Sequence, residues 1–350
     1  PTDCDDDDAN IGPHADEIRG NTTDEDCDGY LDELAVPDEF ETIDEALGAA
    51  NSGDVIQLGI GTWVQALDLT GKNITIAGEG CDKTTLYGDG GGSVLVMDAG
   101  SVEKITLSGG DSTYGGGLSI SGWVSVADTC IQQNNASEGG GGIAVVTGGA
   151  DLSGVRMEGN QALYGGGLFV GEDVVVTVKR SFFTSNTAGR DGGGLYISDS
   201  SVMVENTVFA ANHSNYSGGA FYAQNLTTEY ASDGTVIDEH EGEPLLQIIQ
   251  STFHSNWAKV LGQGGYNWRG HIVMNQNILS GHHATDAYNT QLIYNYYPLS
   301  ENIADTYLWD NVGSDLRVAY LQEAYRLDPK YQLSDPTLDP TEWDLRLGPD

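Results

Sequence analysis

The sequence has few basic residues and no long apolar run. Lys and Arg number 14 against 53 Asp and Glu, so the formal net charge is −39. A chain this acidic repels polyanions, which argues against nucleic acid, anionic lipid and acidic polysaccharides as partners and favours divalent cations. No apolar run is long enough to cross a bilayer and no signal peptide is present, so we expect no membrane insertion and a mature chain or a fragment.

Two short motifs recur along most of the chain. In the first, an apolar residue and two variable positions precede an asparagine, and the copies end at Asn134, Asn160, Asn186, Asn212 and Asn256, with His282 in place of a sixth asparagine. The second motif is a glycine run, found at 115–117, 140–142, 165–167, 192–194 and 218–219. Both recur every 25 to 27 residues, apart from one step of 44. A period in this range is typical of a solenoid.

The contents of one repeat indicate which solenoid this is. Each repeat has three short runs of β-branched and aromatic residues, such as 118–120, 124–126 and the asparagine motif, and none is long enough for a helix. The sequence therefore predicts an all-β fold, a single-stranded, right-handed parallel β-helix with three strands per coil. Residues one period apart then lie roughly 4.8 Å apart.

This spacing predicts two ladders and two corners. Ile131, Met157, Phe183 and Phe209 should stack as an internal apolar ladder. The asparagines should stack at one corner, where Asn tolerates a left-handed backbone and its amide can bond the copies above and below. The glycine runs should form another corner, which needs positive φ and close backbone approach. Both ladders are interpreted as structural rather than catalytic.

Parts of the repeat resemble known families. The segments 218–221 (Gly-Gly-Ala-Phe) and 253–256 (Phe-His-Ser-Asn) resemble the GGA and FxxN repeats of polymorphic outer membrane proteins. The segment 40–58 resembles the entry into pectin-lyase-like β-helices, where an amphipathic helix caps the first coil. Its apolar face would be Ile43, Ala46, Leu47 and Ala50. The resemblance covers about residues 38 to 290 and implies a surface-protein fold rather than an activity.

The first 36 residues differ from the repeats because they are acidic and almost free of apolar side chains. Such a segment needs cross-links or ions to hold it together. One stretch matches positions 1, 3, 5, 6, 7 and 9 of a calcium-binding loop: Asp24, Asp26, Asp28, Gly29, Tyr30 and Asp32. Position 12 is Ala35 and not Glu, so the stretch departs from an EF-hand.

The same segment resembles the acidic, cysteine-paired motif of myxobacterial-type surface proteins, itself similar to thrombospondin type 3 repeats. This resemblance implies that Asp3, Asp5, Asp7 and Glu17 help to hold a second Ca²⁺ ion. A solvated acidic tail is the alternative.

Four cysteines are present. Cys4 and Cys27 flank the acidic loops, and a disulfide between them would close the segment in an oxidising compartment. Cys81 and Cys130 are about two coils apart in a uniform register, roughly 9 to 10 Å along the axis. That separation exceeds disulfide reach, so both are expected to be buried free thiols.

These observations predict a calcium-binding segment over 1–36 and a β-helix over 37–350. The β-helix carries an acidic insert at about 225–243 and aromatic-rich coils over 257–350. Loops on a rigid scaffold are frequent binding sites. The aromatic side chains either fill the last coils or contact sugars and proteins.

The sequence favours a non-catalytic, calcium-stabilised protein of the bacterial cell surface. Its role would be adhesion or assembly into a filament, and its partner a protein or a neutral glycan. The alternative is a polysaccharide lyase or glycoside hydrolase, since β-helices host many. The basic residues best suited to such chemistry lie close in sequence, at Lys259, Arg269 and His271, with His282, His283 and Asp286 nearby. No carboxylate pair recurs beside them one coil apart, so no catalytic residue is predicted.

Overall fold

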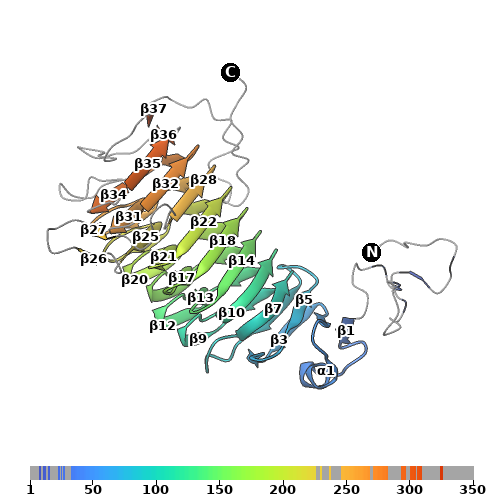
Figure 1. The fold of residues 1–350 in the computed structure, drawn as a ribbon. Helices are drawn as coiled ribbons and strands as arrows, with labels where there is room; N and C mark the ends of the chain where they lie inside the picture. The colour runs from blue at the N-terminus through green and yellow to red at the C-terminus, as the bar shows by residue number, and fades with distance from the viewer. Residues whose placement is uncertain are drawn as a thin grey trace.

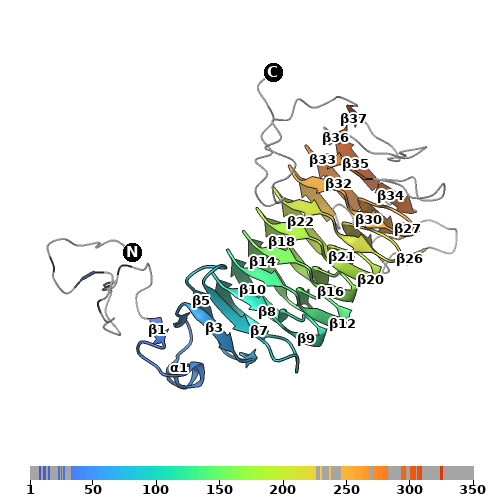
Figure 2. The ribbon, with the colours of Figure 1, turned by 180° about the vertical axis from the view of Figure 1, so that it is seen from behind.

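The computed structural model describes most of the β-helix. The described residues are 8, 11, 12, 15, 23, 25, 27, 33–225, 229–230, 236–237, 246–268, 271–282, 293–296, 300–304, 306–309 and 324–325. The fold is a right-handed parallel β-helix, as the repeats predict, and short strands stack coil upon coil along one axis (Figure 1, Figure 2).

Among the described residues, the strands form three parallel sheets and one antiparallel pair. The 18-stranded sheet contains β1 (Glu33–Val36), β2 (Val55–Leu58), β4 (Leu67–Asp68), β5 (Ile74–Gly78), β7 (Leu95–Glu103), β10 (Leu118–Ala127), β13 (Ile143–Val145), β14 (Gly149–Ser153), β17 (Leu168–Val170), β18 (Val175–Lys179), β21 (Leu195–Ser198), β22 (Ser201–Glu205), β25 (Phe221–Gln224), β28 (Leu246–Ile249), β31 (Gly265–Trp268), β32 (His271–Asn275), β34 (Ile293–Tyr296) and β35 (Ser300–Ala304). The 11-stranded sheet contains β3 (Gly61–Val64), β6 (Thr84–Tyr87), β8 (Thr106–Ser108), β11 (Cys130–Gln132), β15 (Arg156–Glu158), β19 (Phe182–Thr184), β23 (Val208–Ala210), β29 (Thr252–His254), β33 (Ile278–Ser280), β36 (Thr306–Trp309) and β37 (Ala324–Tyr325).

The third parallel sheet has six strands, which the sequence did not predict. They are β9 (Asp111–Tyr114), β12 (Asn135–Gly139), β16 (Gln161–Tyr164), β20 (Thr187–Asp191), β24 (His213–Ser214) and β30 (Trp257–Ala258). β12, β16, β20 and β24 each lie between an asparagine and the next glycine run, whereas β9 precedes the first run and β30 follows Asn256. Their buried row consists of small residues, Ala136, Ala162, Ala188, Ser214 and Ala258. One small inward residue per strand leaves too little hydrophobic alternation to be recognised in the sequence.

A complete coil therefore has four strands, not three. The coil that starts at β12 continues through β13, β14 and β15. Within the 18-stranded sheet, β13 and β14 belong to two separate rows, which the long strands β7 and β10 join. We call these the first row (β13, β17, β21, β25, β31, β34) and the second row (β14, β18, β22, β28, β32, β35).

The core is a set of apolar ladders inside the coils. In the 11-stranded sheet, Ile131, Met157, Phe183 and Phe209 pair coil by coil, as predicted, and continue through Phe253 and Leu279. All six side chains are buried. The ring centroids of Phe183 and Phe209 lie 4.6 Å apart, and those of Phe209 and Phe253 lie 5.0 Å apart. Each ring thus fills the space between two neighbours and excludes water from the axis.

The asparagine corner is a continuous hydrogen-bond ladder. Asn160 Oδ1 accepts from the backbone N–H and the Nδ2 of Asn134, and its own Nδ2 donates to Ile131 O. The same three bonds repeat through Asn186, Asn212 and Asn256.

The expected left-handed backbone lies one residue earlier than predicted. It occurs at the residue before each asparagine, namely Gln133, Gly159, Ser185, Ala211 and Ser255. The asparagine is needed instead for its amide, which satisfies backbone groups that this turn leaves unpaired.

The glycine runs form another corner, as predicted, and their third glycines lie against the asparagine ladder. The first glycine of each run has positive φ, for example 66° at Gly140 and 57° at Gly165. A Cβ on Gly141 would lie 2.3 Å from Gln161 O, and a Cβ on Gly142 would lie 2.6 Å from Gly167 O. Adjacent coils therefore approach so closely at Gly141 and Gly142 that a side chain there would clash with the backbone of the next coil.

A short helix covers the N-terminal end of the β-helix. Helix α1 (Ile43–Ala49) begins at Thr42, whose side chain accepts a hydrogen bond from Glu45 N, and buries Ile43 and Ala46. It lies beside β1 at the blue end of the chain (Figure 1), where the pectin-lyase-like resemblance predicts a cap. Among the described residues, no helix has the length and apolar content that a membrane crossing requires.

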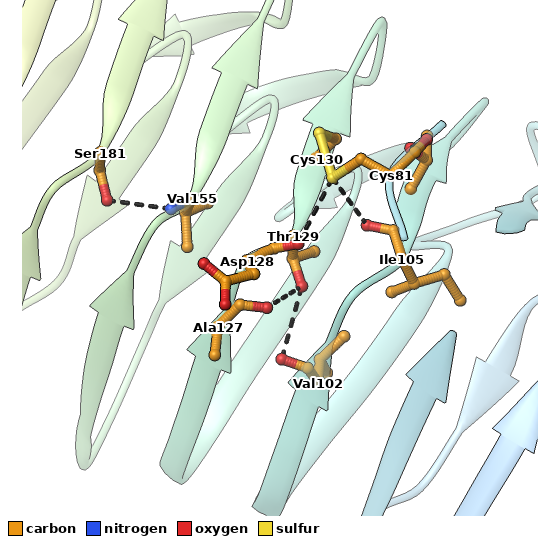
Figure 3. The surroundings of a disulfide bond; sticks show 10 residues. Cys81, Val102, Ile105, Ala127, Asp128, Thr129, Cys130, Val155 and Ser181 are labelled. Carbon is orange, nitrogen blue, oxygen red and sulfur yellow. Dashed lines mark hydrogen bonds between the residues drawn. A yellow bond between two sulfur atoms is a disulfide. The ribbon is translucent and has the colours of Figure 1, made fainter. Parts of the chain in front are cut away.

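Cys81 and Cys130 form a disulfide with a Cα–Cα distance of 5.5 Å, so the expectation of two free thiols is wrong. In strand register Cys130 lies two coils beyond Thr85 of β6, the strand that follows Cys81. The turn before β6, however, rises toward the next coil, where Gly80 N–H donates to Lys104 O and Cys81 O accepts from Thr106 Oγ1. Cys81 therefore lies beside Ile105, one coil from Cys130 (Figure 3).

Candidate functional site

The outer face of the glycine corner carries a continuous row of aromatic rings. Phe169, Tyr196, Tyr222, Tyr266 and Tyr294 occupy equivalent positions on β17, β21, β25, β31 and β34. Successive ring centroids are 5.4, 5.2, 4.9 and 5.2 Å apart, and the ring planes lie within 7° of parallel. We call this set the aromatic row. Because the coils repeat every 4.8 Å or so, one ring per coil gives continuous stacking along the axis.

A second line of residues faces the aromatic row from the six-stranded sheet. Tyr114, Gly139, Tyr164 and Asp191 pair with one another at the ends of β9, β12, β16 and β20. Gly139 has no side chain, and a Cβ there would lie 2.6 Å from the Phe169 ring, which therefore covers it. The Phe169 ring therefore fills the space that Gly139 leaves between Tyr114 and Tyr164.

The two lines meet as two walls of rings. Tyr114 contacts Phe169 with a centroid distance of 5.4 Å and an interplanar angle of 52°. Tyr164 contacts Tyr196 at 5.0 Å and 53°. Arg190 Nη1 donates to the Tyr164 hydroxyl at 2.7 Å, which holds this ring in place. The tilted rings and the stacked rings together present aromatic surface in two directions.

These rings line an open groove of about 660 Å³. The opposite wall is the pair of turns after β13 and β17, which contribute the residues Val146, Thr147, Gly171, Glu172 and Asp173, with Ser198 from β21. Glu172 and Asp173 are exposed. Among the described residues that line the groove, none is Lys, Arg or His. The groove therefore combines apolar faces, hydroxyls and carboxylates. We call it the aromatic groove.

Asp191 lies beside the groove and is almost fully buried, at 4% exposed. Burial raises the pKa of its carboxyl to about 6, although the Ser217 N–H and the Arg190 guanidinium partly offset the shift. Burial also raises the pKa of Tyr196 and Tyr222 far above the usual range, and the charge of Asp191 adds to this effect. Both phenols thus stay protonated and offer hydroxyl donors beside the rings.

We expect Asp191 to make stability depend on pH. In the unfolded chain its carboxyl ionises near 3.8, whereas in the fold it does so at about 6. Its contribution is therefore fully present below pH 3.8 and is lost as the pH rises through 6. The melting temperature of the parent should fall as the pH rises through about 6, and Asp191→Asn should lack this fall. Exposed Glu158→Gln should show the same dependence on pH as the parent. Parallel profiles for all three proteins would disprove the assignment.

The arrangement of the groove is suited to binding more than to catalysis. Glycosidic hydrolysis needs carboxyl groups on both sides of the scissile bond. Here the two lining carboxylates are adjacent in sequence on one turn, and the facing wall is aromatic. A lyase needs a cationic or metal-bound group to neutralise an acidic sugar, and the described lining has no cationic side chain.

The structure brings together only some of the predicted site residues. Asn134, Asn160, Asn186, Asn212 and Asn256 form the buried ladder. The nine predicted calcium ligands all lie outside the described residues: Asp3, Asp5, Asp7, Glu17, Asp24, Asp26, Asp28, Tyr30 and Asp32. In the described part of the chain, no group of three metal-ligating side chains is present. Cys27 forms a disulfide, but Cys4 lies outside the described residues, so this pairing stays a prediction.

The basic residues considered for an enzyme do not form a described site. Lys259 is exposed, and His282 is buried at the sixth position of the asparagine series. Arg269, His283 and Asp286 lie outside the described residues. Of the acidic insert, only the antiparallel pair β26 (Glu229–Tyr230) and β27 (Val236–Ile237) is described.

Sequence reasoning missed the aromatic groove, although a signal was present. The members of the aromatic row follow the glycine corner at intervals of 27, 26, 44 and 28 residues, and the interval of 44 spans the acidic insert. Tyr266 and Tyr294 lie in the coils over 257–350, whose aromatic side chains were predicted either to fill the coils or to contact sugars and proteins, and the other three were not singled out. Tyr114 and Tyr164 lie on strands that were not predicted, so their approach to the row depends on the folded corner.

No protein-family model and no curated protein matches the sequence. Among solved structures, the chain is similar to the pectin methylesterase PemA from Erwinia chrysanthemi, with 12% identity, 68% of this chain and 81% of that chain covered, and a TM-score of 0.39. It is also similar to a pectin methylesterase from Aspergillus niger (16% identity, 80% and 84% covered, TM-score 0.38). An alginate lyase from Paenibacillus sp. matches with 14% identity, 76% and 94% covered, and a TM-score of 0.35. These values are too low to support an activity.

Proposed function

We propose that this protein is a non-catalytic β-helix protein of the bacterial cell surface that binds an extracellular glycan without acidic groups. The observation that carries the proposal is the aromatic groove, in which rings from successive coils line one open channel. Sugar rings present apolar C–H faces that stack on aromatic side chains, and their hydroxyl groups bond polar side chains at the edge. Glycan binding of this kind serves adhesion.

Two further features support an extracellular location and a glycan of this class. The Cys81–Cys130 disulfide is typical of proteins that mature in an oxidising compartment. The net charge of −39 disfavours uronic acid polymers. The alternative to a glycan is a protein that binds along the aromatic row, including a second copy of this chain in a filament.

Binding of neutral oligosaccharides tests the proposal. Calorimetry with hexamers of β-1,4-linked glucose and N-acetylglucosamine should give a measurable affinity for at least one of them, and polygalacturonate should not bind. Tyr114→Ala and Tyr164→Ala should each weaken binding roughly 2- to 10-fold, the equivalent of one aromatic contact. Trp123→Ala is the matched control, because Trp123 is 52% exposed and lies outside the groove.

Three outcomes would contradict the proposal. If neither hexamer binds, the groove is not a glycan site. If Trp123→Ala weakens binding as much as Tyr164→Ala, the site lies elsewhere. Release of new reducing ends or unsaturated products from any of these sugars would instead favour the enzyme alternative.

We also propose that the first 36 residues bind Ca²⁺. The proposal rests on the alternating carboxylates of Asp24, Asp26 and Asp28 in a segment that has almost no apolar side chains of its own. Calorimetry of the whole chain should show Ca²⁺ binding with a Kd of about 10⁻⁴ to 10⁻³ M, as in other extracellular modules. Replacing these three residues by asparagine should remove at least one site. Equal heats for the parent and the triple variant would disprove it.

A further inference from the structure

The charge of the aromatic groove specifies its ligand more closely than its shape does. We propose that the groove selects a cationic sugar, an oligosaccharide of glucosamine type whose amino groups are protonated. This inference rests on the proposed glycan-binding function and adds the charge of the ligand to it.

The aromatic walls are suited to an organic cation. Tyr114 and Tyr164 are tilted by 52° and 53° against Phe169 and Tyr196. These pairs of rings are in contact, so a group in the groove lies against side chains of both lines and not between them. A cation over an open face of such a ring is attracted to it. The volume of about 660 Å³ is large enough for a saccharide rather than for a bare ammonium group.

The opposite wall supplies the countercharge. Glu172 and Asp173 lie together on the turn after β17, and both are exposed at the edge of the groove. An ammonium group that lies over the rings can then approach these carboxylates from inside the groove. On the same wall, Thr147 Oγ1 donates to Ser121 O and can still accept from a sugar hydroxyl.

The nearest positive charge, the Arg190 guanidinium, lies over the Tyr164 ring with its Cζ 5.6 Å from the ring centroid, so a ligand cation has to use the other rings of the groove. Arg190 contacts Tyr164, but its Nε is 3.3 Å from Asp191 Oδ2, and it is not among the residues that line the groove. The pair Arg190–Asp191 adds little net charge. The lining therefore remains acidic, within a chain whose overall charge of −39 also concentrates cations at its surface.

Paired oligosaccharides separate charge from shape. Hexamers of glucosamine and of N-acetylglucosamine share the same backbone, but only the first is cationic below the pKa of its amine. Calorimetry on the whole chain in this pH range should give at least tenfold tighter binding of the glucosamine hexamer. Raising the salt concentration should reduce this difference, since ions screen exposed charges.

Two double variants locate the effect. Glu172→Gln/Asp173→Asn should weaken binding of the glucosamine hexamer about tenfold or more and leave the N-acetylated hexamer unchanged. Glu41→Gln/Glu158→Gln removes the same number of exposed carboxylates outside the groove and should leave both affinities unchanged. All four positions are exposed, and thermal melting confirms that each variant is folded.

The results distinguish failure of this inference from failure of the proposed function. Equal binding of the two hexamers, or equal losses in the two double variants, would overturn the selection of a cation while glycan binding stands. Failure of both hexamers to bind would overturn both proposals. Choline that binds as tightly as the glucosamine hexamer would overturn the assignment to a sugar.

Discussion

Replacing Phe209 by alanine is expected to lower the free energy of unfolding by about 3 to 5 kcal/mol. The ring is fully buried and lies between Phe183 and Phe253, with centroids at 4.6 and 5.0 Å. Its removal leaves a cavity on the axis that the rigid coils above and below cannot fill. Urea denaturation of the parent and the variant measures the loss.

The position of the ring, and not its size, should decide this effect. Phe182→Ala removes the same atoms from a ring on the outer face of β19, where the side chain is only half-buried. It should cost less than half as much. Because each coil contacts only its neighbours, the coils on the two sides of Phe209 should unfold less cooperatively in Phe209→Ala. The unfolding transition of this variant should therefore also broaden. Equal losses for the two variants would show that the ladder register is wrong.

Replacing Asn186 by alanine is expected to cost roughly 2 to 6 kcal/mol. The side chain is fully buried, accepts from the N–H and Nδ2 of Asn160, and donates to Met157 O. Alanine leaves at least two of these buried groups without a partner, and each unsatisfied group costs about 1 to 3 kcal/mol. Thermal and urea denaturation measure the change.

The neighbouring residue Asn135 provides the control for the asparagine ladder. It is exposed, and its Nδ2 donates to Asp111 Oδ1 at 2.7 Å. Asn135→Ala should change the free energy of unfolding by less than about 1 kcal/mol, as expected for one exposed hydrogen bond. A loss at Asn135 that matches the loss at Asn186 would mean that burial of the ladder does not determine its contribution.

Local sequence was sufficient where one residue type repeats at one structural position. Ile131, Met157, Phe183 and Phe209 recur at 26-residue intervals, and this period alone predicts their stacking. Helix α1 was predictable because Ile43 and Ala46 lie on one face after the capping residue Thr42. In both cases the physical signal lies within one repeat or one helical turn.

Prediction failed where the outcome depends on the path of a turn. To predict the disulfide, one would have to know that the turn at Gly80 and Cys81 rises by one coil and bonds to Lys104 and Thr106. A uniform repeat period gives no information about this rise. The six-stranded sheet was missed because its inward residues, such as Ala136 and Ala162, are too small to produce an alternating pattern.

The sequence by itself determined the period, the apolar and asparagine ladders, the helical cap and the acidic net charge of the chain. Each follows from residue types at regular spacing or from a sum over the chain. Only the tertiary structure decided which residues meet across the glycine corner. Tyr114 and Tyr164 approach Phe169 and Tyr196 because the corner allows two sheets to face each other, and such contacts arise from close backbone packing that no local pattern encodes.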